Sequence, residues 1–541
     1  MNLNPIDTII VDGKIASMQT PGDFVAAMAI ADGRIVATGS SAEIRDLAPS
    51  ATVIDARGRL VLPGFIDSHC HPDRYGAQLG RWTYLGDGPD SIDALLDLVR
   101  RKTEGTPQDQ WFVGFGYDDH RLGGYPTRDA LDAAAGGRPA YLNRRDAHLG
   151  FANSAALKII GYDADTPDPA FGRIDRDPVT GDPTGLLRET AAHAIVNYCQ
   201  SKFTTADYSG GLERVFKDFA GYGITSVHNS LCSTEGIEAY QLMREAGTLN
   251  MRVGLLASGR EDDLIDAIIR SGWRTGFGDE WVRLTGVEWC PDCSTSGRTA
   301  AYYEPYIGEK IIGEPDDNRG MLLYEAEDFN QRVLRAHKAG LMVGCDGVGD
   351  RGIDFVLDAF ENALNHHPVK DHRLRVEHCC NVTPAILNRL SRLKVICSSA
   401  TGFAYDLGDS YIRNRGADAM QYMWPHRSMI DAGIVAPGHS DCPVCHPNPM
   451  RGIHSMVNRR TASGADLYQG EAVTVFEAIQ AYTVLGAYVG REEHLKGQLT
   501  IGKLADFTIL EDDIFAISPD QIDQVQVAET YVGGRQVYAR S

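Results

Sequence analysis

The sequence lacks the features that would direct a protein to a membrane or to nucleic acid. It contains no run of roughly 18 apolar residues, so we expect no transmembrane helix. Its 52 Lys and Arg residues face 73 Asp and Glu residues, which gives a formal net charge of −21. A surface with this balance repels phosphate groups, so neither nucleic acid nor an anionic membrane is expected as the main partner.

Internal repeats, low-complexity segments and a basic or long apolar leader region are also missing, and strand-like alternation begins at once. The eleven cysteines are an odd number, scattered through 541 residues, a length that needs no disulfide cross-links. With 43% hydrophobic and 23% charged residues, the composition is that of a folded globular protein. We expect a reduced, cytoplasmic protein, with a homodimer as the default oligomeric state.

Both ends of the chain have the pattern of short strands joined by turns. Asp12-Gly13 and Asp32-Gly33 mark hairpin turns near the start, and the residues after 497 have the same texture. Neither piece carries enough apolar surface to fold alone. We therefore predict that residues 1–62 and 497–541 form one small β-sandwich domain.

Between these ends, strand and helix patterns alternate, which predicts an α/β fold. The strand candidates are residues 65–70, 224–228, 251–256, 282–288, 341–346, 374–378, 395–398 and 434–439. Helical patterns separate most of them, at 326–339, 351–364 and 383–392. Eight such strands predict a (β/α)8 TIM barrel over residues 63–72 and 210–496. Three further elements do not fit an eight-stranded barrel: helices at 91–104 and 187–200 and a strand at 139–143. Residues 73–209 are therefore predicted to be an α/β subdomain inserted after the first barrel strand.

The strongest local signal is the stretch LPGFIDSHCH, in which an apolar strand leads into His69 and His71. Their spacing of two places both imidazoles on one face of the strand. At the carboxyl end of a barrel strand, two such nitrogens can hold a divalent metal ion.

Other predicted strands also end in residues of the metal-ligand type. Glu288, Asp346 and His378 end three successive strands, and Asp441 follows the last one. A single carboxylate at a strand end is usually a helix cap or a solvated loop residue. Four such residues on one rim, added to the HxH pair, favour a metal site.

These motifs resemble the amidohydrolase superfamily, in its branch of N-substituted formamide deformylase-like hydrolases (amidohydrolase family 3). The resemblance extends over nearly the whole chain, through the segments GYDDHRLGGYPTRDALDAAAGGRPAYLNRRDAHLGFANSAAL, GITSVHNS, SGRTAAYYEPY, GVGDRGID, RVEHC, GHSDCPV, NPMRGIHSMVNRRT and GQLTIGKLADFTIL. It implies a metal-dependent hydrolase built from a β-sandwich and a barrel. It also implies His69, His71, His378 and Asp441 as metal-site residues.

The chain departs from that family's pattern at two positions. Where the family usually has a lysine that can be carboxylated and bridge metals, this chain has Glu288, which supplies a carboxylate directly. Where the family usually has the histidine of His-x-x-Gly-Asp, this chain has Asp346. The changes leave two readings open: two ions held by three histidines and three carboxylates, or one ion held by fewer of them. Zinc is the expected metal, with manganese or iron as alternatives.

The resemblance predicts hydrolysis of a non-peptide C–N bond in a small molecule: an amide, N-formyl group, lactam or cyclic imide. Asp441 would act as the general base and acid. Chemistry at a C–C or C–O bond of a related carbonyl compound is the alternative within enzymes. A binding or regulatory protein on the same scaffold is the alternative outside them.

Further residues are candidates for binding the substrate or for supporting the metal ligands. The substrate candidates are His148, which matches a family histidine, Asp118 with Asp119, Arg298, His228 and Trp289. Other rim aromatics, Tyr302, Tyr303, Phe403 and Tyr405, suggest an apolar or aromatic substrate. His439 and His446 flank Asp441 and could support it. Cys290/Cys293 and Cys442/Cys445 form two CxxC pairs, for which we favour rim packing over structural zinc.

Overall fold

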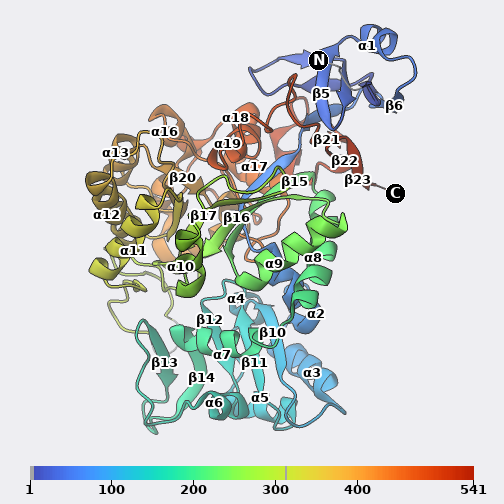
Figure 1. Cartoon of the computed structure of the whole chain (residues 1–541). Helices are drawn as coiled ribbons and strands as arrows, with labels where there is room; N and C mark the ends of the chain where they lie inside the picture. Colours follow the sequence, from blue (N-terminus) through green and yellow to red (C-terminus); the bar gives the residue numbers. More distant parts are fainter. Residues whose placement is uncertain (1–4, 311–313, 541) are drawn as a thin grey trace.

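The computed structural model describes residues 5–310 and 314–540, and its centre is a parallel sheet curved into a nearly closed barrel (Figure 1). Seven strands lie in the order β20-β19-β18-β17-β16-β15-β8, and all neighbours are parallel. They are β8 (Phe65–Cys70), β15 (Ile224–Cys232), β16 (Arg252–Ser258), β17 (Val282–Trp289), β18 (Val343–Gly347), β19 (Arg375–His378) and β20 (Ile396–Ser399). Almost every residue in them is buried, as expected for a parallel sheet covered on both faces.

The predicted eighth strand over residues 434–439 is wrong as a strand, because the segment makes only one isolated bridge, between Gly438 and Ser399. Its backbone still spans the gap between β20 and β8. Ser399 N donates to Pro437 O at 2.8 Å, and Ser68 N donates to Gly438 O at 3.4 Å. Pro437 has no N–H group for a regular ladder, which accounts for the loss of strand geometry.

Helices pack around the outside of the barrel strands. They are α8 (Thr205–Ala220), α9 (Thr234–Ala246), α10 (Asp262–Arg270), α11 (Ala326–Lys338), α12 (Asp350–His366) and α13 (Pro384–Leu393). The helices predicted at 326–339, 351–364 and 383–392 are confirmed to within two residues at each end. No helix within the described part of the chain is long and apolar enough to span a bilayer.

The long stretch after β8 begins with a helix, α2 (Pro72–Arg81), that the sequence pattern did not predict. It packs closely against α8, because Gly76 of one helix faces Gly211 of the other. A Cβ atom built on Gly76 would lie 2.5 Å from the Gly211 carbonyl carbon. The two helices can approach so closely only because both positions lack a side chain.

A second, six-stranded sheet follows, in the order β13-β14-β12-β11-β10-β9. Its strands are β9 (Thr83–Tyr84), β10 (Phe112–Tyr117), β11 (Ala140–Arg144), β12 (Leu149–Ala152), β13 (Gly172–Arg176) and β14 (Pro183–Glu189). The accompanying helices include α3 (Ile92–Thr103), α5 (Arg128–Ala135), α6 (Ser154–Ile160) and α7 (Thr190–Gln200). In Figure 1 these elements lie below the barrel.

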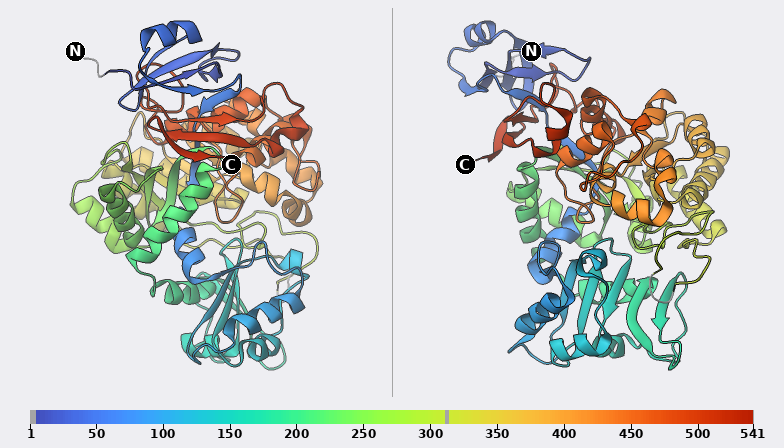
Figure 2. Two further views of the ribbon diagram at one scale, coloured as in Figure 1. Left: turned by 90° about the vertical axis from the view of Figure 1, so that its right-hand side faces the viewer. Right: turned by 180° about the vertical axis from the view of Figure 1, so that it is seen from behind.

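The two ends of the chain supply two further sheets. One contains only N-terminal strands: β5 (Arg34–Gly39), β4 (Ala27–Ala31), β1 (Thr8–Val11) and β6 (Thr52–Asp55). The other combines both ends: β23 (Arg535–Ala539), β22 (Val527–Val532), β21 (Phe507–Leu510), β7 (Leu60–Pro63), β2 (Lys14–Ala16) and β3 (Phe24–Val25). Buried residues of both sheets, such as Ile10 and Phe507, share one hydrophobic cluster. Figure 2 shows these sheets at the opposite end of the molecule from β9–β14.

Candidate metal centre

The HxH pair lies at the carboxyl end of β8, where both imidazoles converge on Asp441. His69 Nε2 is 3.3 Å and His71 Nε2 is 3.0 Å from Asp441 Oδ1. His71 Nδ1 is 3.0 Å from the Ser230 carbonyl oxygen, which can only accept a hydrogen bond. The proton of a neutral His71 is therefore on Nδ1, and its Nε2 lone pair points at the carboxylate. Such a contact requires a proton or a metal cation between the two atoms.

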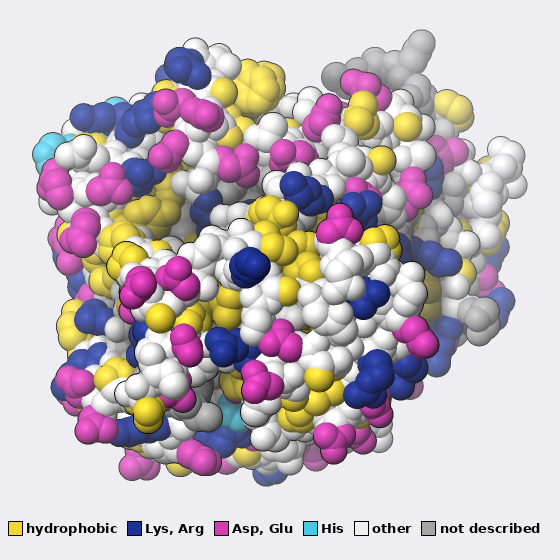
Figure 3. Space-filling view, turned by 90° about the horizontal axis from the view of Figure 1, so that it is seen from below, with side chains coloured by type: hydrophobic (Ala, Val, Ile, Leu, Met, Phe, Trp, Pro, Cys, Tyr) yellow, Lys and Arg dark blue, Asp and Glu magenta, His cyan; other side chains and the backbone are white. Residues whose placement is uncertain are grey.

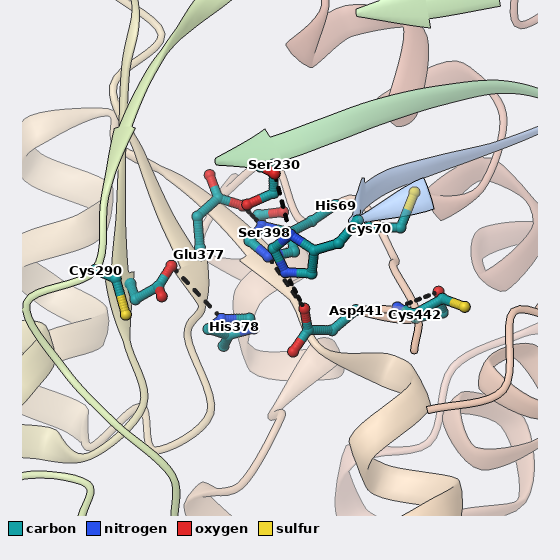
Figure 4. Close-up of polar contacts among 12 residues, drawn as sticks. His69, Cys70, Ser230, Cys290, Glu377, His378, Ser398, Asp441 and Cys442 are labelled. Carbon is teal, nitrogen blue, oxygen red and sulfur yellow. Dashed lines mark hydrogen bonds and ion pairs between the residues drawn. The ribbon is translucent and has the colours of Figure 1, made fainter. Parts of the chain in front are cut away.

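His378 and Asp346 form the opposite side of the same site. His378 Nε2 is 3.5 Å from Asp346 Oδ1, and the imidazole stacks on Phe403 at 5.3 Å between ring centroids. His378 and Asp441 both have left-handed backbones, with φ of +63° and +55°. Residues other than glycine rarely adopt this conformation, and where they do, they are concentrated at functional sites. Figure 4 shows His69, His378 and Asp441 directed toward one another.

Glu288, at the end of β17, is fully buried beside His69. Its Oε1 accepts a hydrogen bond from Ser230 Oγ at 2.6 Å and lies 3.7 Å from His69 Nδ1. Its Oε2 has no hydrogen-bond partner. Burial raises the pKa of the Glu288 carboxyl, and the negative charges of Asp346 and Glu377 add to this effect while His69 opposes it.

Glu377 is a member of the site that the sequence reasoning missed. It is fully buried, and its Oε2 lies 2.9 Å from His69 Nδ1. Arg375 donates to both of its carboxylate oxygens. A His69 that donates its Nδ1 proton to Glu377 keeps Nε2 free as a metal ligand. Arg375 and Glu377 are two residues apart in β19, so they share one face. In the sequence, the signal that could have identified Glu377 was two opposite charges at this spacing within a predicted barrel strand.

The donor set fits a divalent metal. Two groups of potential ligand atoms each lie within 4.8 Å of one another: His69, His71 and Asp441, and His69, Asp346 and His378. Several buried polar atoms here lack hydrogen-bond partners: Glu288 Oε2, Asp346 Oδ1, His378 Nδ1 and both ring nitrogens of His439. Buried polar atoms are costly to leave unpaired, and ligand nitrogens and carboxylate oxygens are satisfied by a metal ion.

Electrostatics in the site follow from this clustering. Burial lowers the pKa of His69, but the carboxylates of Glu288, Asp441 and Glu377 outweigh it and raise that pKa. Burial raises the pKa of Asp441, but His378, His69 and His71 outweigh it and hold that pKa well below its usual value. Asp441 is therefore a carboxylate at neutral pH.

A cavity of about 390 Å³ opens directly onto these residues. His71, Asp346, His378 and Asp441 line its floor. Further lining residues come from the segments around β11, β12 and α7: residues 143–148, His193, Val196, Asn197, Gln200 and Ser201. Its size is near the lower end of ligand pockets, which measure about 300–1,000 Å³. The cavity therefore joins the candidate metal centre to the structure inserted after β8.

Of the predicted substrate-binding residues, His148 is the one found in the cavity lining. His228 is fully buried inside the barrel, with Nδ1 3.3 Å from Arg375 Nη1. Arg298 forms a bidentate pair with Glu314. Neither His228 nor Arg298 is among the residues that line the cavity. Arg298 is engaged by Glu314, whereas His228 Nε2 is buried without a hydrogen-bond partner.

Asp118 and Trp289 also lie outside the cavity lining. Asp118 pairs with Arg145 and caps α4 (Asp119–Leu122), while Asp119 pairs with Arg144. Trp289 is 2% exposed and packs in a hydrophobic core cluster. The aromatic residues that do line the cavity are Phe115, Phe203 and Tyr208, none of which the sequence reasoning selected.

The histidines and cysteines that flank Asp441 in the sequence lie in different surroundings. The ring of His439 lies 4.9 Å from that of His69, whereas His446 Nε2 lies 3.3 Å from the Tyr222 hydroxyl. All eleven cysteines are free and buried. No candidate ligand group among the described residues contains both members of a CxxC pair; one combines Cys293 with His148 and Glu189.

His148 and Glu189 form a buried pair that makes stability depend on pH. His148 Nδ1 is 2.8 Å from Glu189 Oε2. Burial lowers the pKa of His148, but Glu189 and Asp146 outweigh it and raise that pKa to about 9. An unfolded histidine titrates near 6.5. The pair should therefore contribute up to about 3 kcal/mol below pH 6.5, and lose it as the pH rises through 9.

We expect the stability difference between wild type and His148→Gln to shrink as the pH is raised from 6 to 10. Urea unfolding at each pH measures that difference, and subtraction cancels the groups common to both proteins. Glu189→Gln should produce the same trend, because it removes the partner charge. A difference that stays constant across this range would contradict the assignment.

Comparisons with known proteins agree with this geometry. The model of a family described as the amidohydrolase family matches residues 52–538. N-substituted formamide deformylase of Arthrobacter pascens is 28% identical over 565 aligned positions, which cover 99% of each chain. Crystal structures of uncharacterized metal-dependent hydrolases from Pyrococcus horikoshii and Pyrococcus furiosus have TM-scores of 0.76 and 0.73. They are 24% and 27% identical, and the matches cover 95% and 94% of this chain and 99% of each of theirs.

Proposed function

The chain belongs to the amidohydrolase family of hydrolytic enzymes, and on that premise we propose that it hydrolyses a non-peptide C–N bond of a small molecule. The bond would belong to an amide, N-formyl group, lactam or cyclic imide. Addition of water across it gives a carboxylate and an amine. The relative named as an N-substituted formamide deformylase supports this reaction class.

The observation that carries the proposal is the convergence of ligand-type residues on the cavity. His71, Asp346, His378 and Asp441 come from four different segments of the barrel and line one space. Barrel enzymes place their chemistry at this carboxyl end of the strands. A small molecule in the cavity would therefore meet the candidate metal ligands directly.

We propose that His69, His71 and Asp441 hold one ion. One ring nitrogen binds one ion, so His69 Nε2 can serve only one of the two ligand groups. A second ion would rely on Asp346, His378 and the unpaired Oε2 of Glu288. The nitrogen and oxygen donors suit zinc, with manganese or iron as alternatives. When bound, such a metal lowers the pKa of water and polarises a carbonyl group.

Asp441 would carry the proton in this reaction. Its carboxylate, ionised at neutral pH, takes a proton from the attacking water and delivers it to the departing nitrogen. The contacts from His69 and His71 hold the carboxylate in place. Its backbone is also fixed, since Asp441 N donates to His69 O at 3.0 Å.

Metal analysis and a substrate panel test the proposal together. We expect one or two zinc, manganese or iron ions per chain by mass spectrometry, and at least about a hundredfold loss of activity after chelation. Zinc, manganese or iron added back singly should identify the working metal. The panel contains N-formyl amines, acyl amides, lactams and cyclic imides, with esters and diketones as competitors. Full activity without metal, or turnover of esters and diketones alone, would overturn the proposal.

The architecture supports a division of labour that we include in the proposal. Residues 63–72 and 210–496, with segment 434–439 closing the barrel, would form the catalytic domain. Residues 73–209 would cover its mouth, and residues 1–62 with 497–541 would form the separate β-sandwich domain. We also retain a cytoplasmic location, because eleven free cysteines suit a reducing compartment.

A further inference from the structure

Arg74 lies in the cavity wall next to the candidate metal centre. It belongs to α2, three residues after His71, and is one of the residues lining the cavity. Its Nη2 donates to the Leu231 carbonyl at 2.9 Å, and the preceding residue, Ser230, contacts His71. The guanidinium group is thus held by the residue next to Ser230, which itself contacts the candidate ligand His71. No carboxylate among the described residues forms an ion pair with it.

Arg260 reaches the cavity from the loop after β16. Ser258 is paired in register with Glu288, and Gly259 N donates to Glu288 O at 2.7 Å. Arg260 is the next residue and lines the cavity. Its side chain is exposed. Burial lowers the pKa of Arg260, but Cys290 and the charge of Asp346 contribute to a net rise. Cys290, which also lines the cavity, is a hydrogen-bond partner of the Arg260 side chain.

Most of the other cationic and acidic groups in the lining have partners or belong to the candidate metal centre. Arg144 pairs with Asp119 and Asp146, and Arg145 pairs with Asp118. Among the lining carboxylates, Asp346 and Asp441 belong to the metal centre, Glu261 accepts from Thr234, and Glu235 is exposed at the start of α9. None of these carboxylates makes an ion pair with Arg74 or Arg260, within the part of the chain that is described.

Arg74 and Arg260 act on the same part of the cavity. His193 also lines the cavity. Burial and the nearby charges of Arg260, His148 and Arg74 hold the pKa of His193 well below its usual value. On the face shown in Figure 3, Lys and Arg side chains are interspersed with Asp and Glu. A chain of net charge −21 thus has, among its described residues, two arginines in the lining of one cavity that form no ion pair with a carboxylate. Cations enclosed in this way attract an anionic ligand group.

We propose that Arg74 and Arg260 form a subsite for a carboxylate of the substrate, so that the preferred substrates are N-acyl amino acids or related acidic amides. This inference rests on the proposed function, because it places the scissile carbonyl at the metal centre and the carboxylate at the arginines. The planar guanidinium fork matches a carboxylate and binds it by charge-assisted hydrogen bonds. The cavity of about 390 Å³ accommodates a small molecule that reaches both ends.

Matched ligand pairs test the subsite. The ligands are N-formyl and N-acetyl derivatives of D- and L-alanine, leucine and phenylalanine, each as the free carboxylate and as the carboxamide. Calorimetry on the metal-loaded protein measures affinity, and amine release measures turnover. We expect the best carboxylate to bind about tenfold or more tightly than its carboxamide. Equal affinities throughout the panel would overturn the proposal, and this comparison needs no variant.

Arginine variants then locate the preference. Arg260→Gln should weaken carboxylate binding about tenfold while changing carboxamide binding less than threefold. Arg74→Gln should act in the same direction, and Arg260→Lys should recover part of the loss because it keeps the charge. Arg270→Gln is the matched control, since Arg270 is exposed at the end of α10 and outside the cavity lining. A preference that survives both glutamine variants would contradict the assignment.

The two proposals fail in different ways. Arginine-dependent binding of carboxylates without any amine release would remove the proposed hydrolysis of these amides and support the subsite. Hydrolysis of carboxamides and carboxylates at equal efficiency would support the proposed function and overturn the subsite.

Discussion

Asp441→Asn is expected to lower kcat/KM by a factor on the order of 10² to 10⁴, the usual contribution of a positioned general acid or base. Asparagine has nearly the same shape as aspartate and keeps one oxygen, but it cannot accept the proton of the attacking water. His378, His69 and His71 hold the pKa of the Asp441 carboxyl well below its usual value, so the group is ionised at neutral pH and has a lone pair that can accept this proton. The fold and much of the metal content should be retained.

The measurement compares steady-state kinetics with metal content in the same preparations. Asp406→Asn is the matched control, because Asp406 is also hydrogen-bonded, to His446 N and Arg451, but does not line the cavity. It should retain most of the activity. Near-wild-type turnover in a metal-loaded Asp441→Asn protein would exclude Asp441 as the proton carrier.

The sequence predicted that the candidate ligands lie close together because parallel strands share one geometry. In a barrel, all strands end on one rim, so ligand-type residues at strand ends must lie near one another. His378 ends its strand in the structure, and His69, Glu288 and Asp346 are each the last but one residue of theirs. β8 itself, at 65–70, was predicted to the residue, because a proline and a glycine precede a short buried apolar run.

The opposite wall of the cavity could not be predicted from the same pattern. Arg145, His148 and His193 reach the cavity only because the sheet β9–β14 and helix α7 fold back toward the barrel. That placement depends on long-range packing, which no local periodicity encodes. The rim aromatics show the opposite error: Trp289 and Tyr302 are buried in core clusters although their positions suggested the pocket.

The sequence analysis also missed the charged pair Arg375 and Glu377 inside the barrel. Local rules assign apolar residues to the barrel core, so the paired Arg375 and Glu377 run against them. They are tolerated because each satisfies the other, and because Glu377 also contacts His69. Only the three-dimensional structure shows that the pair supports a candidate ligand.

Arg375→Met is expected to destabilise the protein by about 3–5 kcal/mol, because it leaves Glu377 as an uncompensated buried charge. Both side chains are fully buried. Arg375 also donates to Ser68 O at 2.7 Å and to Ser398 Oγ at 3.0 Å, so its loss leaves further buried acceptors without a partner. Chemical and thermal unfolding of wild type and variant measure the loss of stability.

Two variants separate this mechanism from a general loss of packing. Arg373→Met, two residues earlier, removes an arginine whose partners Asp371 and Glu493 have exposed fractions of 53% and 39%, so it should cost about 1 kcal/mol or less. Adding Glu377→Gln to Arg375→Met removes the unpaired charge and should restore a substantial part of the stability. If the double variant is no more stable than Arg375→Met, the buried charge is not the cause. The same double variant should bind metal more weakly than wild type, because His69 then loses the carboxylate that orients its ring.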